Sequence, residues 1–281
     1  MIHDLSFHAE KSRKRRPILK VGEHGRYSYD VMGTDTDHKD QIHMHALISM
    51  LQEAASLNGA DIGFGAEVMD QHNVCWLLLR MSVQMSRRPA WQERINIETW
   101  SCGYDKLFFP REYIMCDDDG EQIGTASTLW IVADKSTHRP VRPMDFYNML
   151  SWTKEKYDLR NIMTELPPKI CPMMDVSYMD LHQNDADTIC KYADYSEIDR
   201  NLHVNNTRYI AWCLDAVHFQ SLDQGNVLGI DINFLSEIHF AEKVVLFRSC
   251  DRDNCQIHVD GYVPSRKKVA FSAILHLRED E

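Results

Sequence analysis

The chain lacks an apolar run long enough to span a bilayer, since the longest, VCWLLL, covers only residues 74–79 of 281. The N-terminal stretch MIHDLSFHAEKSRKRRP also lacks the apolar segment of a secretory signal. We therefore expect a cytoplasmic protein without membrane contact. The length and the 44% share of hydrophobic residues are sufficient for two globular domains with sizeable cores.

Cysteine pairs are absent as well. The eight cysteines occur singly and form no CxxC motif, at positions 75, 102, 116, 171, 190, 213, 250 and 255. Zinc sites and thiol redox motifs usually contain closely paired cysteines. We therefore expect reduced and mostly buried thiols, with no metal and no cofactor.

An excess of positive charge is also lacking, because the formal net charge is −11 at pH 7. This balance argues against nucleic-acid binding, which needs a broad basic face. Two local basic segments remain, KSRKRR at 11–16 and SRKK at 265–268. They are either solvated surface or docking sites for an acidic partner.

What the chain does contain is an internal repeat. Shifted by 162 positions, the segment DTDHKDQIHMHALISMLQEA (35–54) aligns with EIDRNLHVNNTRYIAWCLDA (197–216). Both segments pass from polar residues into apolar positions at helical spacing, which predicts one helix in each half. A second similarity, between 91–97 and 240–246, has a smaller offset, so the first copy carries extra residues between helix and strand.

Antiparallel strands are predicted after each helix. In the first half they cover 75–86, 95–116 and 122–134, with a hairpin turn at DDDGEQ, and in the second half 243–251, 255–263 and 267–277. A helix followed by a meander, twice over, predicts an α+β fold of two similar domains. We expect a first domain at 1–145, a linker with a short helix and several prolines at 146–185, and a second domain at 186–281.

The segment DRNLHVNN (199–206) carries the strongest sign of chemistry. It places Asp199, Asn201 and His203 on alternate residues directly before the second predicted helix, which Asn205 or Asn206 would cap. An imidazole exchanges protons near neutral pH, and a nearby carboxylate can orient it. An amide can hold a carbonyl oxygen.

The equivalent positions of the first copy differ. Gln41 aligns with His203, and Arg88 aligns with Glu237. One copy would then perform the chemistry while the other binds or supports. The alternative interpretation is that the polar segment only caps a helix.

The segment IDRNLHVNNTRYIAWCLDA (198–216) resembles the active-site motif of the fatty acyl-acyl carrier protein (acyl-ACP) thioesterases of plants and bacteria. FFPREY (108–113) and STLWIVADKSTHRPVRP (127–143) resemble strands of the first domain of that family. The resemblance implies a tandem hotdog fold, in which each antiparallel sheet wraps around a central helix. It also implies hydrolysis of acyl-ACP to free fatty acid and holo-ACP in fatty acid biosynthesis.

By this resemblance, Asp199, Asn201, His203 and Glu237 are the catalytic residues. Ile238 stands where the plant pattern has a cysteine, so a cysteine nucleophile is not expected.

For the reaction, we expect Glu237 and His203 to activate a water molecule and His203 to protonate the leaving thiolate. Asn201, with the backbone near Val204 and Asn205, would bind the substrate carbonyl. Asp199 would either orient the site or attack the thioester as the nucleophile.

The first domain would hold the acyl chain in an apolar tunnel that includes Trp76 and Met81. The acidic carrier protein would dock on basic residues, with candidates at Lys106, Arg111, Arg208, Lys267, Lys268 and the segment RRPILK (15–20). We expect a monomer or a homodimer. The alternatives are an acyl-CoA thioesterase, a hotdog dehydratase and a non-catalytic acyl-carrier binding protein.

Overall fold

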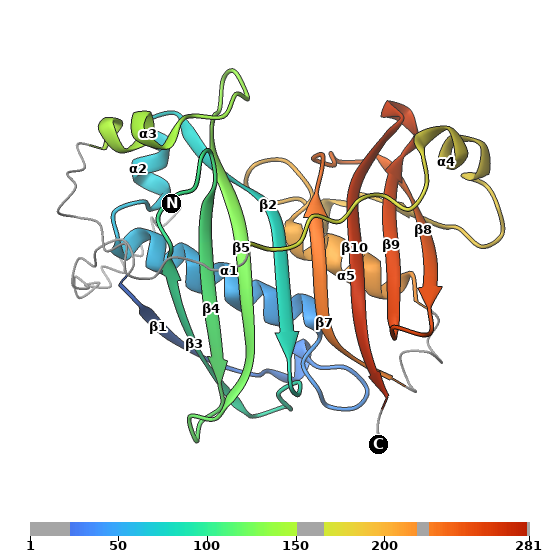
Figure 1. The fold of residues 1–281 in the computed structure, drawn as a ribbon, viewed down its shortest axis with the longest axis horizontal. Coiled ribbons are helices and arrows are strands. Elements are labelled where there is room, and N and C mark those ends of the chain that lie inside the picture. The colour runs from blue at the N-terminus through green and yellow to red at the C-terminus, as the bar shows by residue number, and fades with distance from the viewer. Residues whose placement is uncertain (1–22, 151–165, 218–224, 280–281) are drawn as a thin grey trace, which may run out of the picture.

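Ten strands form one continuous antiparallel sheet in the computed structural model, which describes residues 23–150, 166–217 and 225–279 (Figure 1). Their order is β1-β3-β4-β5-β2-β7-β10-β9-β8-β6, so the two halves mirror each other about the β2–β7 pair. The strands are β1 Gly25–Asp30, β2 Val74–Met85, β3 Arg94–Ser101, β4 Phe109–Cys116, β5 Gln122–Asp134, β6 Ile189–Tyr192, β7 Gly225–Phe234, β8 Lys243–Asp251, β9 Gln256–Val263 and β10 Lys268–Glu279.

The predicted meanders are confirmed, and β5 and β8 have the predicted bounds. The predicted hairpin turn between β4 and β5 contains Gly120, whose φ of +81° favours glycine. The predicted stretch 95–116 is two strands, β3 and β4, and β7 was not among the predicted strands. The short strands β1 and β6, which open the two halves, were not predicted either. Four to six residues with weak alternation give little signal for a strand.

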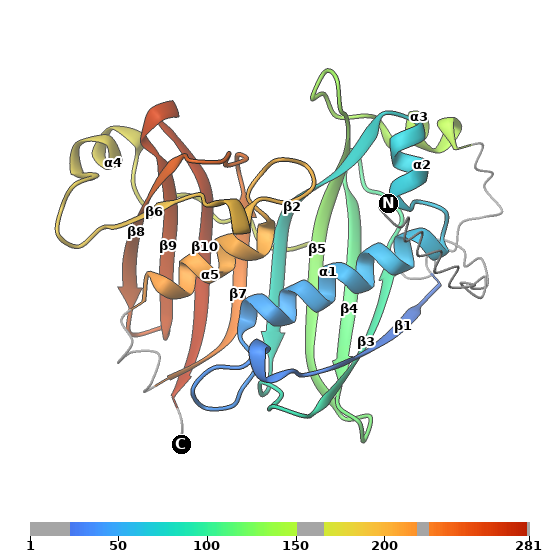
Figure 2. The same ribbon diagram turned by 180° about the vertical axis from the view of Figure 1, so that it is seen from behind.

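The two predicted helices, α1 (Met44–Asp61) and α5 (Asn206–Asp215), lie across the same face of the sheet (Figure 2). Three short helices accompany them, α2 (Ala66–Gln71), α3 (Pro143–Met149) and α4 (Val176–His182). The extra length of α1 and the presence of α2 account for the additional residues of the first copy. No helix in the described ranges combines the length and the apolar character needed to cross a membrane.

One hydrophobic core fills the space between these helices and the sheet. Ile48 and Leu51 of α1 and Ile210 and Cys213 of α5 are fully buried in it, together with apolar residues of most strands. Because both halves supply residues to this core and share one sheet, they form a single structural unit. Burial of this kind contributes about 1.5–3 kcal/mol for each large aliphatic side chain.

Two parts of the predicted linker at 146–185 are described: residues 146–150 contain the end of α3, and residues 166–185 contain an extended stretch and then α4. The extended stretch crosses the face of the sheet opposite the central helices (Figure 1). Buried polar side chains of the sheet hold it, since Asn233 Nδ2 donates to the Ile170 carbonyl at 2.9 Å and Asp260 Oδ2 accepts from the Met173 amide at 2.8 Å.

The cysteines correct one expectation. All eight are free thiols, as predicted, but only Cys102 and Cys213 are buried. Cys190 lies on the edge strand β6, and Cys250 and Cys255 lie at the turn between β8 and β9, where side chains face solvent. The prediction that most cysteines are buried was therefore wrong, because it took residue type as a guide without regard to strand position.

Candidate active site

The loop between β6 and α5 carries Asp199, Asn201 and His203. The Asp199 carboxylate accepts a hydrogen bond from the backbone N–H of Asn201 at 2.7 Å. The backbone N–H of Asp199 donates to the His203 carbonyl at 2.8 Å. Leu202 completes the turn in the left-handed conformation, with φ of +65°. This Asx turn fixes the point at which the His203 side chain leaves the backbone.

The start of α5 follows the sequence prediction, with Asn205 as its cap. The Asn205 side chain accepts from the Thr207 amide at 2.9 Å. The Val204 amide donates to the Ile238 carbonyl at 2.8 Å, and the Asn205 amide donates to the Glu197 carbonyl at 2.8 Å. Both donors are thus satisfied by the protein, and the structure does not support them as ligands of a substrate oxygen.

Glu237 follows β7, and neighbouring side chains hold its backbone. The Tyr209 hydroxyl accepts from the Ile238 amide at 3.1 Å, and Arg266 Nη2 donates to the Glu237 carbonyl at 2.5 Å. Arg266 also pairs with Glu242, with 2.9 Å between Nε and Oε1. Burial raises the pKa of Tyr209, so this hydroxyl stays protonated. The segment after β7 is therefore fixed from both α5 and the turn before β10.

His203 and Glu237 come together as the resemblance implied. His203 Nε2 lies 3.2 Å from Glu237 Oε2, and the two side chains are 25% and 40% exposed, so water reaches them. The ring of His239 meets the His203 ring edge-on, with 4.9 Å between centroids. An imidazole beside a carboxylate can take up and release a proton near neutral pH. The geometry is that of a general acid–base pair.

The first half repeats this backbone frame without the acid–base pair. The Ile42 amide donates to the Pro89 carbonyl at 2.8 Å, matching the bond in the second half. Gln41 and Arg88 occupy the positions of His203 and Glu237, and Arg88 Nη2 donates to Gln41 Oε1 at 2.7 Å. Arg88 Nη1 also pairs with Asp37 at 2.8 Å. Neither glutamine nor arginine exchanges a proton near pH 7.

Asp37 forms in the first half the turn that Asp199 forms in the second. Its carboxylate accepts from the Lys39 amide at 2.8 Å, and Asp40 is left-handed with φ of +56°. This aspartate shapes the loop in a half where Gln41 stands in place of His203. The comparison favours an orienting role for Asp199 over nucleophilic attack.

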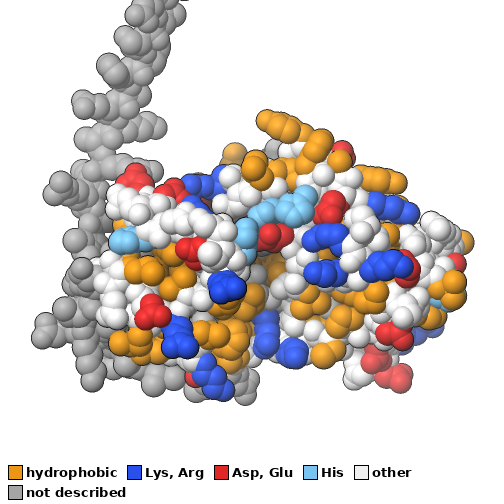
Figure 3. Space-filling view, turned by 90° about the horizontal axis from the view of Figure 1, so that it is seen from above, with side chains coloured by type: hydrophobic (Ala, Val, Ile, Leu, Met, Phe, Trp, Pro, Cys, Tyr) orange, Lys and Arg blue, Asp and Glu red, His pale blue; other side chains and the backbone are white. Residues whose placement is uncertain are grey.

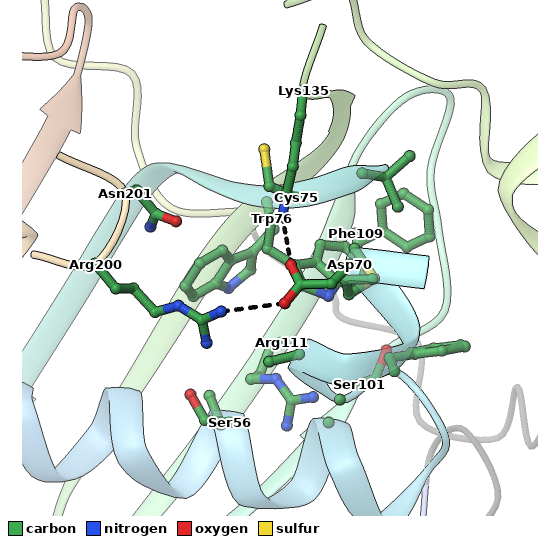
Figure 4. A pocket seen from close by; sticks show the side chains of 18 of the residues that line it. Ser56, Asp70, Cys75, Trp76, Ser101, Phe109, Arg111, Lys135, Arg200 and Asn201 are labelled. Atoms are coloured by element: carbon green, nitrogen blue, oxygen red, sulfur yellow. Dashed lines mark hydrogen bonds and ion pairs between the residues drawn. The ribbon is translucent and has the colours of Figure 1, made fainter. Parts of the chain in front are cut away.

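A cavity of about 270 Å³ lies between α1, α2, the start of β2 and the loop before α5 that carries Arg200 and Asn201 (Figure 4). Trp76 lines it, as predicted, and Asn201 and Arg200 line it from the second half. Met81 is 1% exposed and packs in the main core with residues of α1, because it lies further along β2 than the cavity reaches. The apolar part of the wall comes mainly from Ala55, Phe64, Met69, Val74, Trp76, Phe109, Pro110 and Trp130.

Aromatic packing gives one side of the cavity its shape. Trp76 meets Phe109 edge-on at 5.0 Å and Phe146 of α3 at 5.4 Å, measured between ring centroids. Phe64 and Tyr147 complete the cluster at 5.9 Å from each other. Each such pair contributes about 0.5–1.5 kcal/mol beyond the burial of its apolar surface. The pairs therefore stabilise this wall of the cavity.

Cys75 is a thiol on the wall of the cavity. Burial raises its pKa, and the charge of Lys135 opposes this increase only in part. The thiol therefore stays protonated and is a poor nucleophile.

A charged group not foreseen from the sequence bridges the two halves at the cavity. Asp70 of α2 accepts hydrogen bonds from Lys135 and, at 3.2 Å, from Arg200 Nη2 (Figure 4). The hydrogen bond from Lys135, with the charges of both cations, holds the pKa of Asp70 below its usual range. This ion group ties α2 to the turn that carries Asn201.

The predicted docking residues differ in their exposure and in their contacts. Arg111 is 8% exposed and bonds the neutral side chains of Asn58 and Thr99, so its inclusion was wrong. Lys106 is exposed, and Lys267 pairs with Asp180 at 2.7 Å. The basic segments at 11–16 and 15–20 lie outside the described residues.

Three residues at the site were missed by sequence reasoning. His239 could have been found, because residues two apart in an extended segment point to the same side, and Glu237 was already a candidate. Tyr209 and Arg266 act through contacts with distant parts of the chain, for which the sequence gives no signal. Ile238 is fully buried and offers no thiol, as expected.

Comparison with known proteins agrees with this fold. The model of the acyl-ACP thioesterase N-terminal domain matches residues 22–149, and that of the C-terminal domain matches residues 181–268. An oleoyl-acyl carrier protein thioesterase of Arabidopsis thaliana is 24% identical over 69% of this chain and 54% of its own length. An acyl-[acyl-carrier-protein] hydrolase of Cuphea viscosissima is 21% identical over 89% of this chain and 58% of its own length. The chain thus spans little more than half the length of these curated relatives.

Solved structures show the same architecture. An acyl-ACP thioesterase from Bacteroides thetaiotaomicron has a TM-score of 0.77 at 21% identity, covering 91% of this chain and 98% of that one. The 12:0-ACP thioesterase from Umbellularia californica also has a TM-score of 0.77, at 16% identity, covering 92% and 98%. The predicted tandem hotdog fold is confirmed. Since the two family models together match well over half of its residues, the chain belongs to the acyl-ACP thioesterase family.

Proposed function

We propose that this protein hydrolyses the thioester of fatty acyl-ACP and releases a free fatty acid and the carrier thiol. The observation that carries the proposal is the approach of His203 Nε2 to within 3.2 Å of Glu237 Oε2, beside a loop whose Asn201 lines an apolar cavity. An acid–base pair next to an apolar cavity is the arrangement that thioester hydrolysis of a long acyl chain requires.

The chemistry follows from these groups. His203, paired with the Glu237 carboxylate, takes one proton of a water molecule as the water oxygen attacks the thioester carbonyl carbon. The Asn201 side chain donates to the carbonyl oxygen while negative charge develops on it. The C–S bond then breaks, and His203 delivers the proton to the thiolate sulfur. Water supplies the oxygen of the acid, so the overall reaction consumes only the thioester and one water molecule.

Asp199 is assigned an orienting role in this proposal. Its carboxylate accepts a hydrogen bond from the backbone N–H of Asn201. Asp37 makes the same turn in the first half, where Gln41 stands in place of His203. The first half supplies most of the acyl cavity, and the second half supplies the acid–base pair. A division of labour between the copies is therefore part of the proposal.

The decisive experiment measures release of free thiol from acyl-ACP and from acyl-CoA of several chain lengths. We expect a higher kcat/KM on the carrier-linked series. A protein that prefers acyl-CoA would be a hydrolase of a different thioester, and binding without thiol release would identify a carrier-binding protein. The Glu237→Gln variant, which keeps the size of the side chain and removes the carboxylate charge beside His203, serves as the negative control.

We place the end of the first half at Met149 in place of residue 145, because Phe146 and Tyr147 of α3 pack in the aromatic cluster of that half. A cytoplasmic location and a monomeric or homodimeric state stay predictions from the sequence. The curated relatives cited above are named as chloroplastic proteins.

A further inference from the structure

A cluster of metal-ligating side chains lies at the surface of the site. One ligand atom from each of His203, Glu237 and His239 can be chosen so that all three lie within 4.8 Å of one another. Histidine side chains lie beside acidic ones near the middle of the face shown in Figure 3. His239 has no part in the proton chemistry proposed above, so its presence calls for a separate explanation.

The backbone brings the three ligands together with little freedom. His203 and His239 are opposite each other in an isolated antiparallel bridge, and the His239 amide donates to Glu242 Oε2 at 2.8 Å. Arg266 holds the Glu237 carbonyl and Glu242 at once. The cluster is therefore built on a fixed frame, and only side-chain rotation is needed to adjust it.

The equivalent place in the first half offers no such set. Gln41, Arg88 and Ala90 stand at the corresponding positions, and the bridge between Gln41 and Ala90 matches that between His203 and His239. The ligand set is thus a feature of the second half alone. It was not foreseen from the sequence, because the search for metal sites relied on paired cysteines.

Two histidines and one glutamate form a known ligand set of zinc, with bonds of about 2.0–2.2 Å and a fourth position left for water. Ligand atoms of one ion then lie about 3–4 Å apart, and the 3.2 Å between His203 and Glu237 is within this range. Imidazole and carboxylate ligands of this kind favour Zn²⁺, Ni²⁺ and Cu²⁺ over Mg²⁺ or Ca²⁺. The exposure of His239 leaves the fourth position open to solvent.

We propose that His203, Glu237 and His239 bind a divalent ion of the zinc class and that this ion inhibits the hydrolysis. The inhibitory part rests on the proposed function, since an ion on His203 Nε2 and Glu237 removes the two groups that move the proton. Binding of the ion itself does not depend on that function.

Binding is tested without substrate, by titrating the full chain with Co²⁺ and Zn²⁺. A four-coordinate Co²⁺ ion with nitrogen and oxygen ligands absorbs in the visible range, whereas thiolate ligation adds a strong near-ultraviolet band. We expect the visible band without the thiolate band, and one Zn²⁺ bound per chain by calorimetry. His239→Gln and Glu237→Gln should each weaken binding by about tenfold or more. His182→Gln is the matched control, because His182 pairs with Asp185 at 2.8 Å and the described residues place no third ligand beside them.

Inhibition is tested by following thiol release from acyl-ACP with added Zn²⁺, each variant being compared with its own rate in chelator. We expect His239→Gln to require about tenfold more Zn²⁺ for half-inhibition, and His182→Gln to match the wild type. Stimulation by Zn²⁺, or binding that is unchanged in both ligand variants, would overturn the inference. If neither thioester type is hydrolysed, the proposed function fails, and the titrations alone decide the ion site.

Discussion

His203 is the residue on which the proposed chemistry depends most directly, because it takes up and then delivers the proton. We expect His203→Ala to lower kcat by about 10²-fold or more, the usual contribution of general acid–base catalysis. Thiol release at saturating acyl-ACP measures the effect, and a thermal unfolding curve confirms that the variant is folded. Gln41→Ala, at the equivalent position of the first half, should leave kcat unchanged. Near wild-type turnover in folded His203→Ala would remove the histidine from the mechanism.

Two roles are open to Asp199, orientation of the loop and nucleophilic attack, and substitution of this residue distinguishes them. Asparagine keeps a side-chain oxygen that can accept from the Asn201 amide, now 2.7 Å from the carboxylate, but it cannot act as a nucleophile. We expect Asp199→Asn to retain kcat to within about tenfold, the scale of one weakened hydrogen bond, and Asp199→Ala to lose more. Single-turnover rates of both variants are the measurement. Equal and complete loss in both would favour nucleophilic attack.

At the scale of elements, the contact between α5 and the end of β7 sets the position of Glu237. Tyr209→Phe removes the acceptor of the Ile238 amide, and an unsatisfied buried donor costs about 1–3 kcal/mol. Because Tyr209 positions the carboxylate and does not touch substrate, kcat should fall while KM changes little. Steady-state kinetics and urea unfolding test this expectation.

The control for this variant is Tyr113→Phe, since Tyr113 is a buried tyrosine of the first half with only a 3.5 Å contact to Thr128. It should alter stability without a specific effect on kcat. A drop in kcat of the same size in both variants would mean that the effect reflects general loosening of the core.

A second element contact, between α1 and α5, gives the fold a pH dependence. Burial, together with the nearby charges of His43 and Arg208, lowers the pKa of His45 from 6.5 to about 4. As the pH falls below 6.5, the unfolded chain binds a proton that the folded chain resists. The contribution of neutral His45 to stability is therefore present above pH 6.5 and is lost between 6.5 and about 4.

The measurement is the free energy of unfolding in urea across this pH range for wild type and His45→Gln. We expect the variant to lose less stability than the wild type on acidification, because glutamine does not titrate. A mock-treated wild-type sample, measured in the same buffers, is the control for the effect of pH on urea unfolding. Parallel curves for wild type and His45→Gln would contradict the assignment.

At the scale of the whole molecule, the acyl cavity lies largely in one half and the acid–base pair in the other. Trp76→Leu should enlarge the cavity and shift the preference toward longer acyl chains, since each methylene in an apolar pocket is worth about 1–3 kcal/mol. Relative kcat/KM over a series of acyl-ACP substrates measures the shift. Met81→Leu, a core substitution outside the cavity, should leave the profile unchanged, and identical profiles for both variants would contradict the placement of the chain.

Several features of the fold and site were predicted from short stretches of sequence. The bounds of β5 and β8, the cap at Asn205 and the turn containing Gly120 depend on the periodicity and backbone preference of neighbouring residues. Met81 shows where this reasoning ends, because its place in the core depends on how far the cavity extends along β2. Arg111 shows the same limit, since a charged residue was read as surface and lies buried.

The sequence by itself determined that the chain is a duplicated α+β protein and that its second copy carries Asp199, Asn201 and His203 before a capped helix. These properties depend on residues close together in the chain, whose periodicity and hydrogen-bonding preferences act locally. Only the tertiary structure decided that the halves share one sheet and one core, and that His239 joins His203 and Glu237. Distances between segments far apart in sequence depend on strand register and packing, and no local pattern encodes them.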